Sequence, residues 1–143
     1  MASRDLFEYV RAQRGTVDAL RGRVERMRAA AGIHAASFDV VTTGGRGDRY
    51  ATVDALIDGD ACGKLERAER DLSAATARAR GIIAELSHKK PLDADILAAY
   101  YVDGMTWASI GAQLCACGSS NPADWARMRA MRAFRYIDKM NLT

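Results

Sequence analysis

The chain has 143 residues, of which 49% are hydrophobic and 27% are charged, and its formal net charge is +3. This length predicts one domain or two very small ones, and this composition is that of a globular protein rather than a disordered one. No apolar run approaches the ~20 residues that a membrane-spanning helix needs. The first residues, MASRDLFEYV, lack the apolar stretch of a secretory signal. We therefore expect a cytoplasmic protein without a membrane partner.

The residue usage favours helix and argues against catalysis or metal binding. Only 2 Pro and 7% aromatic residues stand beside frequent Ala and Arg, which predicts an all-α fold. Cys62, Cys115 and Cys117 are odd in number and form no pair of C-x-x-C motifs, so we expect neither a disulfide framework nor a zinc site. His34 and His88 have no nearby nucleophile or carboxylate pair. We expect no enzyme activity, no cofactor and no metal.

The first predicted element is one long helix from Ser3, as the N-cap, to Gly32, as the C-terminal stop. Its apolar positions alternate steps of three and four, as in a coiled-coil seam: Leu6, Val10, Gln13, Val17, Leu20, Val24, Met27 and Ala31. Gly15 and Gly22 weaken such a helix by about 1 kcal/mol each. The seam, rather than local propensity, must therefore hold it together.

Residues 33–51 are predicted to form a Gly-rich connector. Phe38, Val40 and Val41 predict a short extended piece, and the glycines after them predict a flexible loop. The tripeptide at residues 46–48 spells an adhesion motif, which we interpret as chance. No Lys-Ser or Lys-Thr follows the glycines, so a phosphate-binding loop is not expected.

A second long helix is predicted from Thr52 or Asp60 to Leu86, with its own seam of three-and-four steps: Leu65, Ala68, Leu72, Ala75, Ala79, Ile82 and Leu86. Two seams joined by a loop predict an antiparallel helical hairpin over residues 1–88. Several seam positions are Ala, which allows close approach but buries little. The hairpin is either self-contained or covered by the C-terminal segment or a second subunit.

The third segment, residues 89–143, predicts three helices. Pro91 suits the first turn of a helix whose apolar stripe runs to Val102, and Asp103-Gly104 predicts a turn. Thr106 is the expected N-cap of a short helix over residues 107–114. Asn121-Pro122-Ala123-Asp124 places a cap, a first-turn Pro and an acid in register, so a last helix begins there and runs to about Met140.

This order of helices is the helix-turn-helix arrangement, in which two helices brace a third that lies in the major groove. The string from Tyr101 to Leu114, YVDGMTWASIGAQL, resembles a stretch of sigma-70 region-4-like proteins of phages and prophages, including ArpU-like transcriptional regulators. The segment from Ala133 to Ile137 is similar to the family's ending. The resemblance implies a transcription regulator in a bacterial host cell, and its motif covers residues 92–137.

Three departures from the family pattern concern the groove-docking geometry. Tyr100 stands in place of Arg, Gly111 stands in place of Ala, and the turn after Leu114 is longer. Gly111 is expected where the short helix crosses a neighbour closely, with Ile110 and Leu114 packed inward.

The last helix predicts one apolar and one basic face. The apolar face is expected to hold Ala126, Ala130, Ala133, Ile137 and Met140, with Phe134 beside them. The basic arc is expected to hold Arg129, Arg132, Arg135 and Lys139, which would contact phosphates or guanine edges. Asn121, Asp124 and Arg127 are the expected base readers, because recognition helices usually enter the groove at that end. A merely solvated basic face is the alternative.

The sequence thus predicts a sequence-specific regulator that binds double-stranded DNA, with a hairpin that either forms a homodimer or contacts an RNA polymerase subunit. Two other readings stay open. One is an oligomeric assembly protein, such as a DNA-packaging adaptor of the small-terminase kind. The other is a protein-only interaction module, which the balance of five bases and five acids over residues 91–143 favours.

Overall fold

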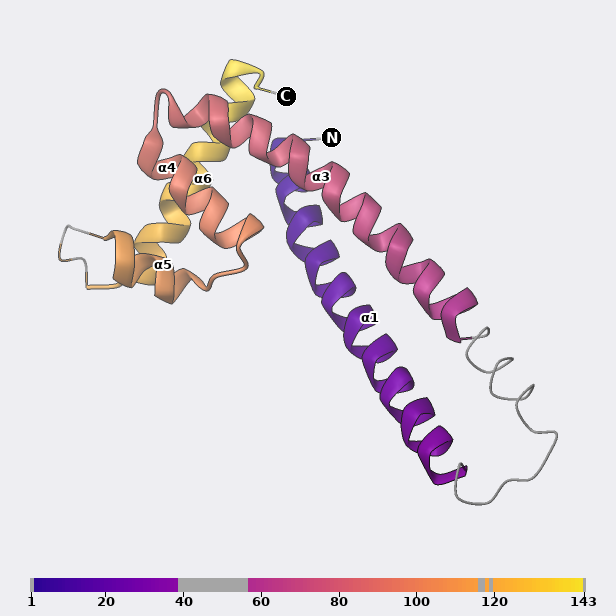
Figure 1. The fold of residues 1–143 in the computed structure, drawn as a ribbon. Helices are drawn as coiled ribbons and strands as arrows, with labels where there is room; N and C mark the ends of the chain where they lie inside the picture. Colours follow the sequence, from indigo (N-terminus) through magenta and orange to yellow (C-terminus); the bar gives the residue numbers. More distant parts are fainter. Residues whose placement is uncertain (1, 39–56, 116–117, 119, 143) are drawn as a thin grey trace. The chain divides into compact units, whose positions relative to one another are not determined.

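The computed structural model describes residues 2–38, 57–115, 118 and 120–142. Over these residues the chain forms helices joined by turns, and none of the residues described lies in a strand, which confirms the all-α prediction (Figure 1). The elements are α1 (Ser3–Phe38), the π-helical turn η1 (Ile57–Cys62), α3 (Gly63–Ser87), α4 (Pro91–Leu97), the π-helical turn η2 (Ala98–Val102), α5 (Trp107–Leu114) and α6 (Pro122–Met140). None of the helices described is long and apolar enough to cross a membrane.

The chain divides into two compact units. Unit 1 comprises Met1–Gln13 and Leu72–Thr143, and unit 2 comprises Arg14–Asp71. The predicted boundary between residues 88 and 89 lies inside unit 1. Each long helix therefore contributes one part to each unit, and α4 to α6 share unit 1 with the start of α1 and the end of α3.

Two predicted details of the first helix are wrong. α1 continues to Phe38, past the predicted stop at Gly32 and through part of the predicted extended piece, because an interior glycine lowers helix stability without forcing an end. The Ser3 side chain does not cap the helix: the Ala2 carbonyl accepts from the amides of Asp5 and Leu6. Instead, the Ser3 hydroxyl bonds to Asp138 Oδ1 at 2.5 Å. The predicted connector beyond Phe38, at residues 39–51, lies outside the described residues.

Unit 2 contains antiparallel parts of α1 and α3. Arg21 Nη2 lies 2.8 Å from Glu69 Oε1, and the later Arg28 Nη2 lies 3.4 Å from the earlier Cys62 Sγ. Because the partner numbers fall as the α1 numbers rise, the two segments run in opposite directions. Among the residues whose burial is described, unit 2 buries only small or medium side chains: Val17, Val24, Ala61 and Ala68.

Unit 1 contains a larger core with an aromatic centre. The ring of Phe7 meets those of Tyr101 and Phe134 edge to face, with centroids 5.6 and 5.4 Å apart. Residues of every helix in the unit complete the core, including Val10, Ala79, Leu86, Ile96, Leu97, Ile110, Ala130 and Ile137. The seam pattern missed Phe7, which is fully buried beside the predicted Leu6. α1 therefore turns a wider face to this core than a coiled-coil seam predicts.

The predicted helix starts in the C-terminal segment are confirmed. Pro91 and Pro122 occupy first-turn positions, and the Thr106 hydroxyl accepts the amide of Ser109 at 3.2 Å. Gly104 adopts φ 75°, which glycine tolerates in the turn before α5.

α5 crosses the start of α6 closely at Gly111. A Cβ atom there would lie 2.3 Å from the Pro122 carbonyl oxygen and 2.4 Å from its carbon. Only glycine permits this approach of the two backbones, which confirms the expected close crossing.

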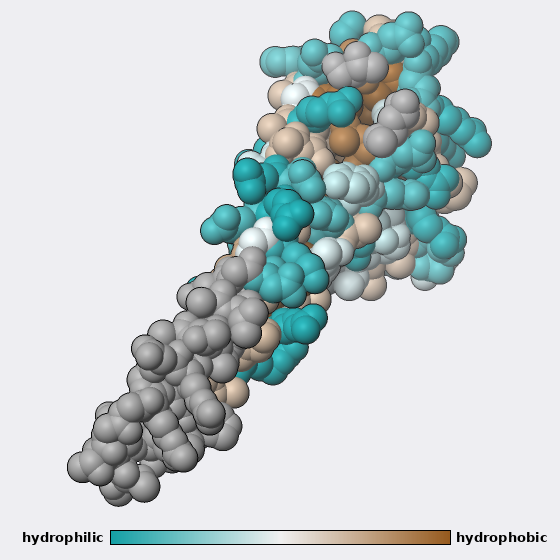
Figure 2. Space-filling model, turned by 90° about the vertical axis from the view of Figure 1, so that its right-hand side faces the viewer, coloured by the Kyte–Doolittle hydropathy of each residue, from teal (hydrophilic) through white to brown (hydrophobic). Residues whose placement is uncertain are grey.

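The described surface has few large apolar side chains. On the face seen in Figure 2, hydrophilic residues surround a limited hydrophobic area in the upper part of the view. Among the described residues, the exposed large apolar side chains are Tyr9, Met128, Met131 and Met140. Three of these four belong to α6, which is also the helix predicted to carry the function.

Candidate nucleic-acid interface

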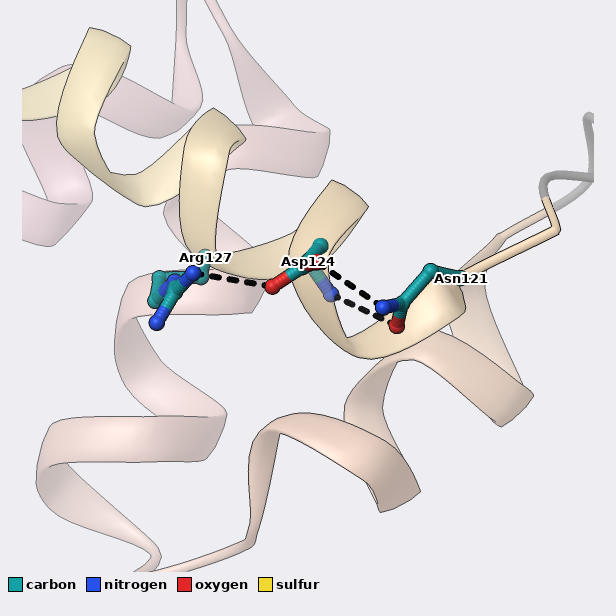
Figure 3. Close-up of polar contacts among 3 residues, drawn as sticks. All are labelled: Asn121, Asp124 and Arg127. Carbon is teal, nitrogen blue, oxygen red and sulfur yellow. Dashed lines mark hydrogen bonds and ion pairs between the residues drawn. The ribbon is translucent and has the colours of Figure 1, made fainter.

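The predicted base readers lie together at the N-terminus of α6 (Figure 3). Asn121 Oδ1 accepts the amide of Asp124 at 3.3 Å, and Asn121 Nδ2 donates to Asp124 Oδ2 at 2.8 Å. Asp124 Oδ1 in turn accepts from Arg127 Nη2 at 2.9 Å. All three residues are exposed. Asn121 is thus the N-cap, as predicted, and the Asp124 carboxylate holds the Arg127 side chain at the first turn.

The predicted apolar face of α6 is confirmed except at its end. Ala126, Ala130, Ala133 and Ile137 are buried, together with Phe134. Met140, at the end of the same face, is 45% exposed and is not part of the core. It is the last residue of α6, and Asn141 follows it with a left-handed φ of 49° that ends the helix.

Arg129 does not belong to the exposed basic arc, which corrects the prediction. Its Nε donates to Asp93 Oδ1 of α4 at 2.7 Å, and the Asp93 side chain is only 5% exposed. The Arg129 guanidinium also lies 5.7 Å from the ring centroid of Trp125. Asp93 is a buried charge and needs this partner. Arg129 therefore ties α6 to α4 and is less available to a polyanion than the exposed cations of the arc.

The other predicted cations of the arc, Arg132, Arg135 and Lys139, are exposed. Within the described part of the chain, these three side chains form no hydrogen bond and no ion pair. They share the face of α6 opposite the core with Met128, which is 53% exposed. This arc can attract a polyanion without first breaking an internal ion pair.

A stack of three side chains, which the sequence pattern did not indicate, fixes the turn before α5. The Arg11 guanidinium lies 3.7 Å above the Tyr100 ring, which stacks on the Trp107 ring with centroids 3.6 Å apart. Arg11 Nη1 also donates to the backbone carbonyls of Tyr100 and, at 3.2 Å, Met105. The start of α1 thus holds η2 and the start of α5 in one arrangement, and no local periodicity could have paired residues so far apart in sequence.

The ring of Tyr101 meets those of Tyr100 and Trp107 edge to face, and Tyr101 is 5% exposed. Burial, with smaller contributions from Glu8 and Tyr100, raises the pKa of its hydroxyl from 10.0 to about 12. The Tyr101 hydroxyl therefore stays protonated through the physiological pH range, and its ring is part of the core of unit 1.

The described residues contain no cluster of His, Cys, Asp or Glu able to hold a metal ion. Cys117, one of the residues weighed as a ligand, lies outside the described residues. Comparison of the chain with protein-family models, with curated proteins and with solved structures found no match. The resemblance to sigma-70 region-4-like regulators therefore rests on the residues of the C-terminal segment alone.

Proposed function

We propose that the protein is a non-enzymatic, sequence-specific DNA-binding transcriptional regulator of phage or prophage type. The observation that carries this proposal is the exposed basic arc of Arg132, Arg135 and Lys139 on α6, a helix whose opposite face is buried in unit 1. A rigid helix that is anchored on one side and basic on the other has the form of a groove-binding helix.

In this proposal, α4 and α5 brace α6 as a tri-helical helix-turn-helix. The close crossing at Gly111 sets the distance between α5 and α6, and the Asp93–Arg129 pair ties α4 to α6. α6 enters the major groove while Arg132, Arg135 and Lys139 meet phosphates. Three such contacts give sequence-independent affinity that falls as salt rises.

Base reading is assigned to the N-terminal end of α6. The Asp124 carboxylate accepts hydrogen bonds from Asn121 and Arg127. The Arg127 guanidinium has five N–H donors, and one of them makes this contact. The remaining donors match the O6 and N7 acceptors of guanine. In this proposal the Asp124 carboxylate orients the Arg127 side chain and leaves its other N–H groups able to bond a base.

The partners follow from the same proposal. Double-stranded DNA binds unit 1, and the long helices α1 and α3 supply either a homodimer contact or a contact with an RNA polymerase subunit. The setting is the cytoplasm of a bacterial host cell, as the resemblance implies.

Selection of bound sequences from a random duplex pool tests the proposal. The double variant R132A/R135A should bind all selected duplexes more weakly, without a change in sequence preference. N121A or R127A should change the preference at one or two positions, with a cost of about 1–3 kcal/mol at each. If the wild-type protein retains no duplex at low salt, the proposed function is wrong.

A second candidate is an oligomeric assembly protein such as a DNA-packaging adaptor. The observation in its favour is that unit 2 buries only Val17, Val24, Ala61 and Ala68 among the residues whose burial is described. Because this core buries few large side chains, helices of further copies could bury additional apolar surface against unit 2. Solution mass separates the candidates: a large ring favours assembly, and a monomer or dimer favours regulation.

A further inference from the structure

The exposed face of α6 carries two methionines between its cations. Met128 is 53% exposed and Met131 is 39% exposed, and both lie in the first half of the helix. Exposed methionines are frequent at binding surfaces, because the thioether side chain is flexible and polarisable. The basic arc alone does not explain why these two positions are apolar.

The helical geometry places these methionines at the centre of the exposed face. At about 100° per residue, Met128 and Met131 lie about 200° and about 140° around the helix from the buried Ala126. Arg132 lies on one side of them, at about 240°, and Arg127 lies on the other, at about 100°. Arg135 and Lys139 lie on the same face, at about 180° and about 220°, but further along α6. The centre of the exposed face is therefore apolar only between Asp124 and Arg135.

This arrangement matches the chemistry of the major groove. A recognition helix usually places the residues nearer its N-terminus against the base edges, while residues further along it reach phosphates. Met128 and Met131 precede Arg132, Arg135 and Lys139 along α6. The apolar group that the major groove offers is the C5 methyl of thymine. A thioether donates no hydrogen bond, so it gains nothing at the acceptor atoms of guanine.

We propose that Met128 and Met131 determine sequence specificity by contacting thymine methyl groups at adjacent positions of the target duplex. This inference rests on the proposed function. The exposed cations that follow the two methionines on the same face, Arg132, Arg135 and Lys139, select duplex DNA as the occupant. Two methionines are also too few to form the apolar centre of a stable protein interface, which buries about 800 Å² on each partner.

Replacement of thymine by deoxyuridine tests the inference directly, because uracil keeps the hydrogen-bonding edge and lacks the methyl group. The probe is the duplex that the full-length wild-type chain selects from a random pool, with thymines replaced one at a time. We expect about a three- to tenfold loss of affinity at one or two positions, the loss typical of one buried methyl group or slightly more.

The variant M128A/M131A should bind the thymine and uracil duplexes equally at those positions, with the wild-type salt dependence. M140A is the matched control, because Met140 is 45% exposed at the last position of the same helix. It should keep the wild-type discrimination. Thermal melting of each variant shows that the fold is retained.

The outcomes separate this inference from the proposed function. If the wild-type chain binds its duplex and no position discriminates thymine from uracil, the inference is wrong and DNA binding stands. If M128A/M131A loses affinity equally for both duplexes and keeps the discrimination, other residues read the methyl groups and the inference is again wrong. If the wild-type chain selects no duplex, the proposed function itself fails.

Discussion

Unit 1 and unit 2 are built on the same two long helices, but they bury very different side chains. Among the residues whose burial is described, the largest fully buried side chains all belong to unit 1: Phe7, Val10, Leu86, Ile96, Leu97, Ile110 and Ile137. In unit 2 the buried residues described are two valines and two alanines. Since burial of apolar area is the main favourable term in folding, we expect the described residues of unit 1 to contribute more to stability than those of unit 2.

The ion pairs of the two units also differ in their exposure to solvent. Unit 1 contains the Asp93–Arg129 pair, in which Asp93 is 5% exposed, whereas the Arg21–Glu69 pair of unit 2 is 53% and 42% exposed. Water screens the second pair far more than the first. The folded scaffold that presents α6 is therefore expected to survive changes in unit 2 and to fail after equivalent changes in unit 1.

The same glycine-to-alanine change should have opposite signs in the two units. G111A places a methyl group 2.3 Å from the Pro122 carbonyl oxygen, so we expect a loss of about 3 kcal/mol in the free energy of unfolding. In G15A the new Cβ meets no atom within 4 Å, so the better helix propensity should stabilise α1 by up to about 1 kcal/mol. Urea denaturation followed by circular dichroism measures both, and equal effects would contradict the comparison.

Removal of one partner from an ion pair should matter only in unit 1. R129M leaves the Asp93 carboxylate buried without a partner, and we expect a loss of about 2–3 kcal/mol, less than for a fully buried pair because Arg129 is 37% exposed. R21M breaks an exposed pair and should cost less than about 1 kcal/mol. In the double variant R129M/D93L most of the loss should be recovered. A cost for R21M as large as that for R129M would show that unit 2 is not the weaker unit.

Substitution of two similarly buried valines of α1, one in each unit, compares the two cores. Val10 of unit 1 is 1% exposed and Val24 of unit 2 is 3% exposed. We expect V10A to cost about 2 kcal/mol and V24A about 1 kcal/mol, because a thin core relaxes around the lost methyl groups. Hydrogen exchange resolves the two sites, and V24A should speed exchange only in unit 2. Global destabilisation by V24A would mean that the units unfold as one.

The Tyr101 hydroxyl makes the stability of unit 1 sensitive to alkaline pH. Its pKa is raised from 10.0 to about 12 in the folded chain, so the folded state holds its proton more tightly than the unfolded state does. The resulting stability is fully present below pH 10 and is lost as the pH rises through about 12. The unfolding free energy of the wild type should fall over this window more steeply than that of Y101F. Parallel pH profiles would show that Tyr101 is not buried in solution.

Much of the fold could be predicted from local sequence patterns. The capping residues Thr106 and Asn121, with Pro91 and Pro122, predicted the starts of α4, α5 and α6 because caps act within one turn of the chain. The three-and-four spacing predicted the buried face of α6. The stop at Gly32 was wrong, because one glycine is a small cost that an otherwise favourable helix absorbs.

The candidate site was only partly predictable, because the ion pair of Arg129 joins it to Asp93, a residue distant in sequence. Arg129 has the same side chain as Arg132, and only the position of Asp93 on α4 shows that one is structural while the other is exposed. The stack of Arg11, Tyr100 and Trp107 likewise joins α1 to the segment before α5. Local periodicity contains no information about such pairs, whereas it did indicate the basic arc.

The most direct test of the account is the salt dependence of binding to the duplex that the wild-type chain selects. If Arg132, Arg135 and Lys139 contact phosphates, the triple alanine variant should lower the slope of log K against log salt by about 2–3, at ~0.9 for each lost contact. The control R23A/R26A/R70A removes the same charge from exposed residues of unit 2 and should leave the slope unchanged. An unchanged slope for the α6 variant, or an equal fall for both, would contradict the assignment of DNA binding to α6.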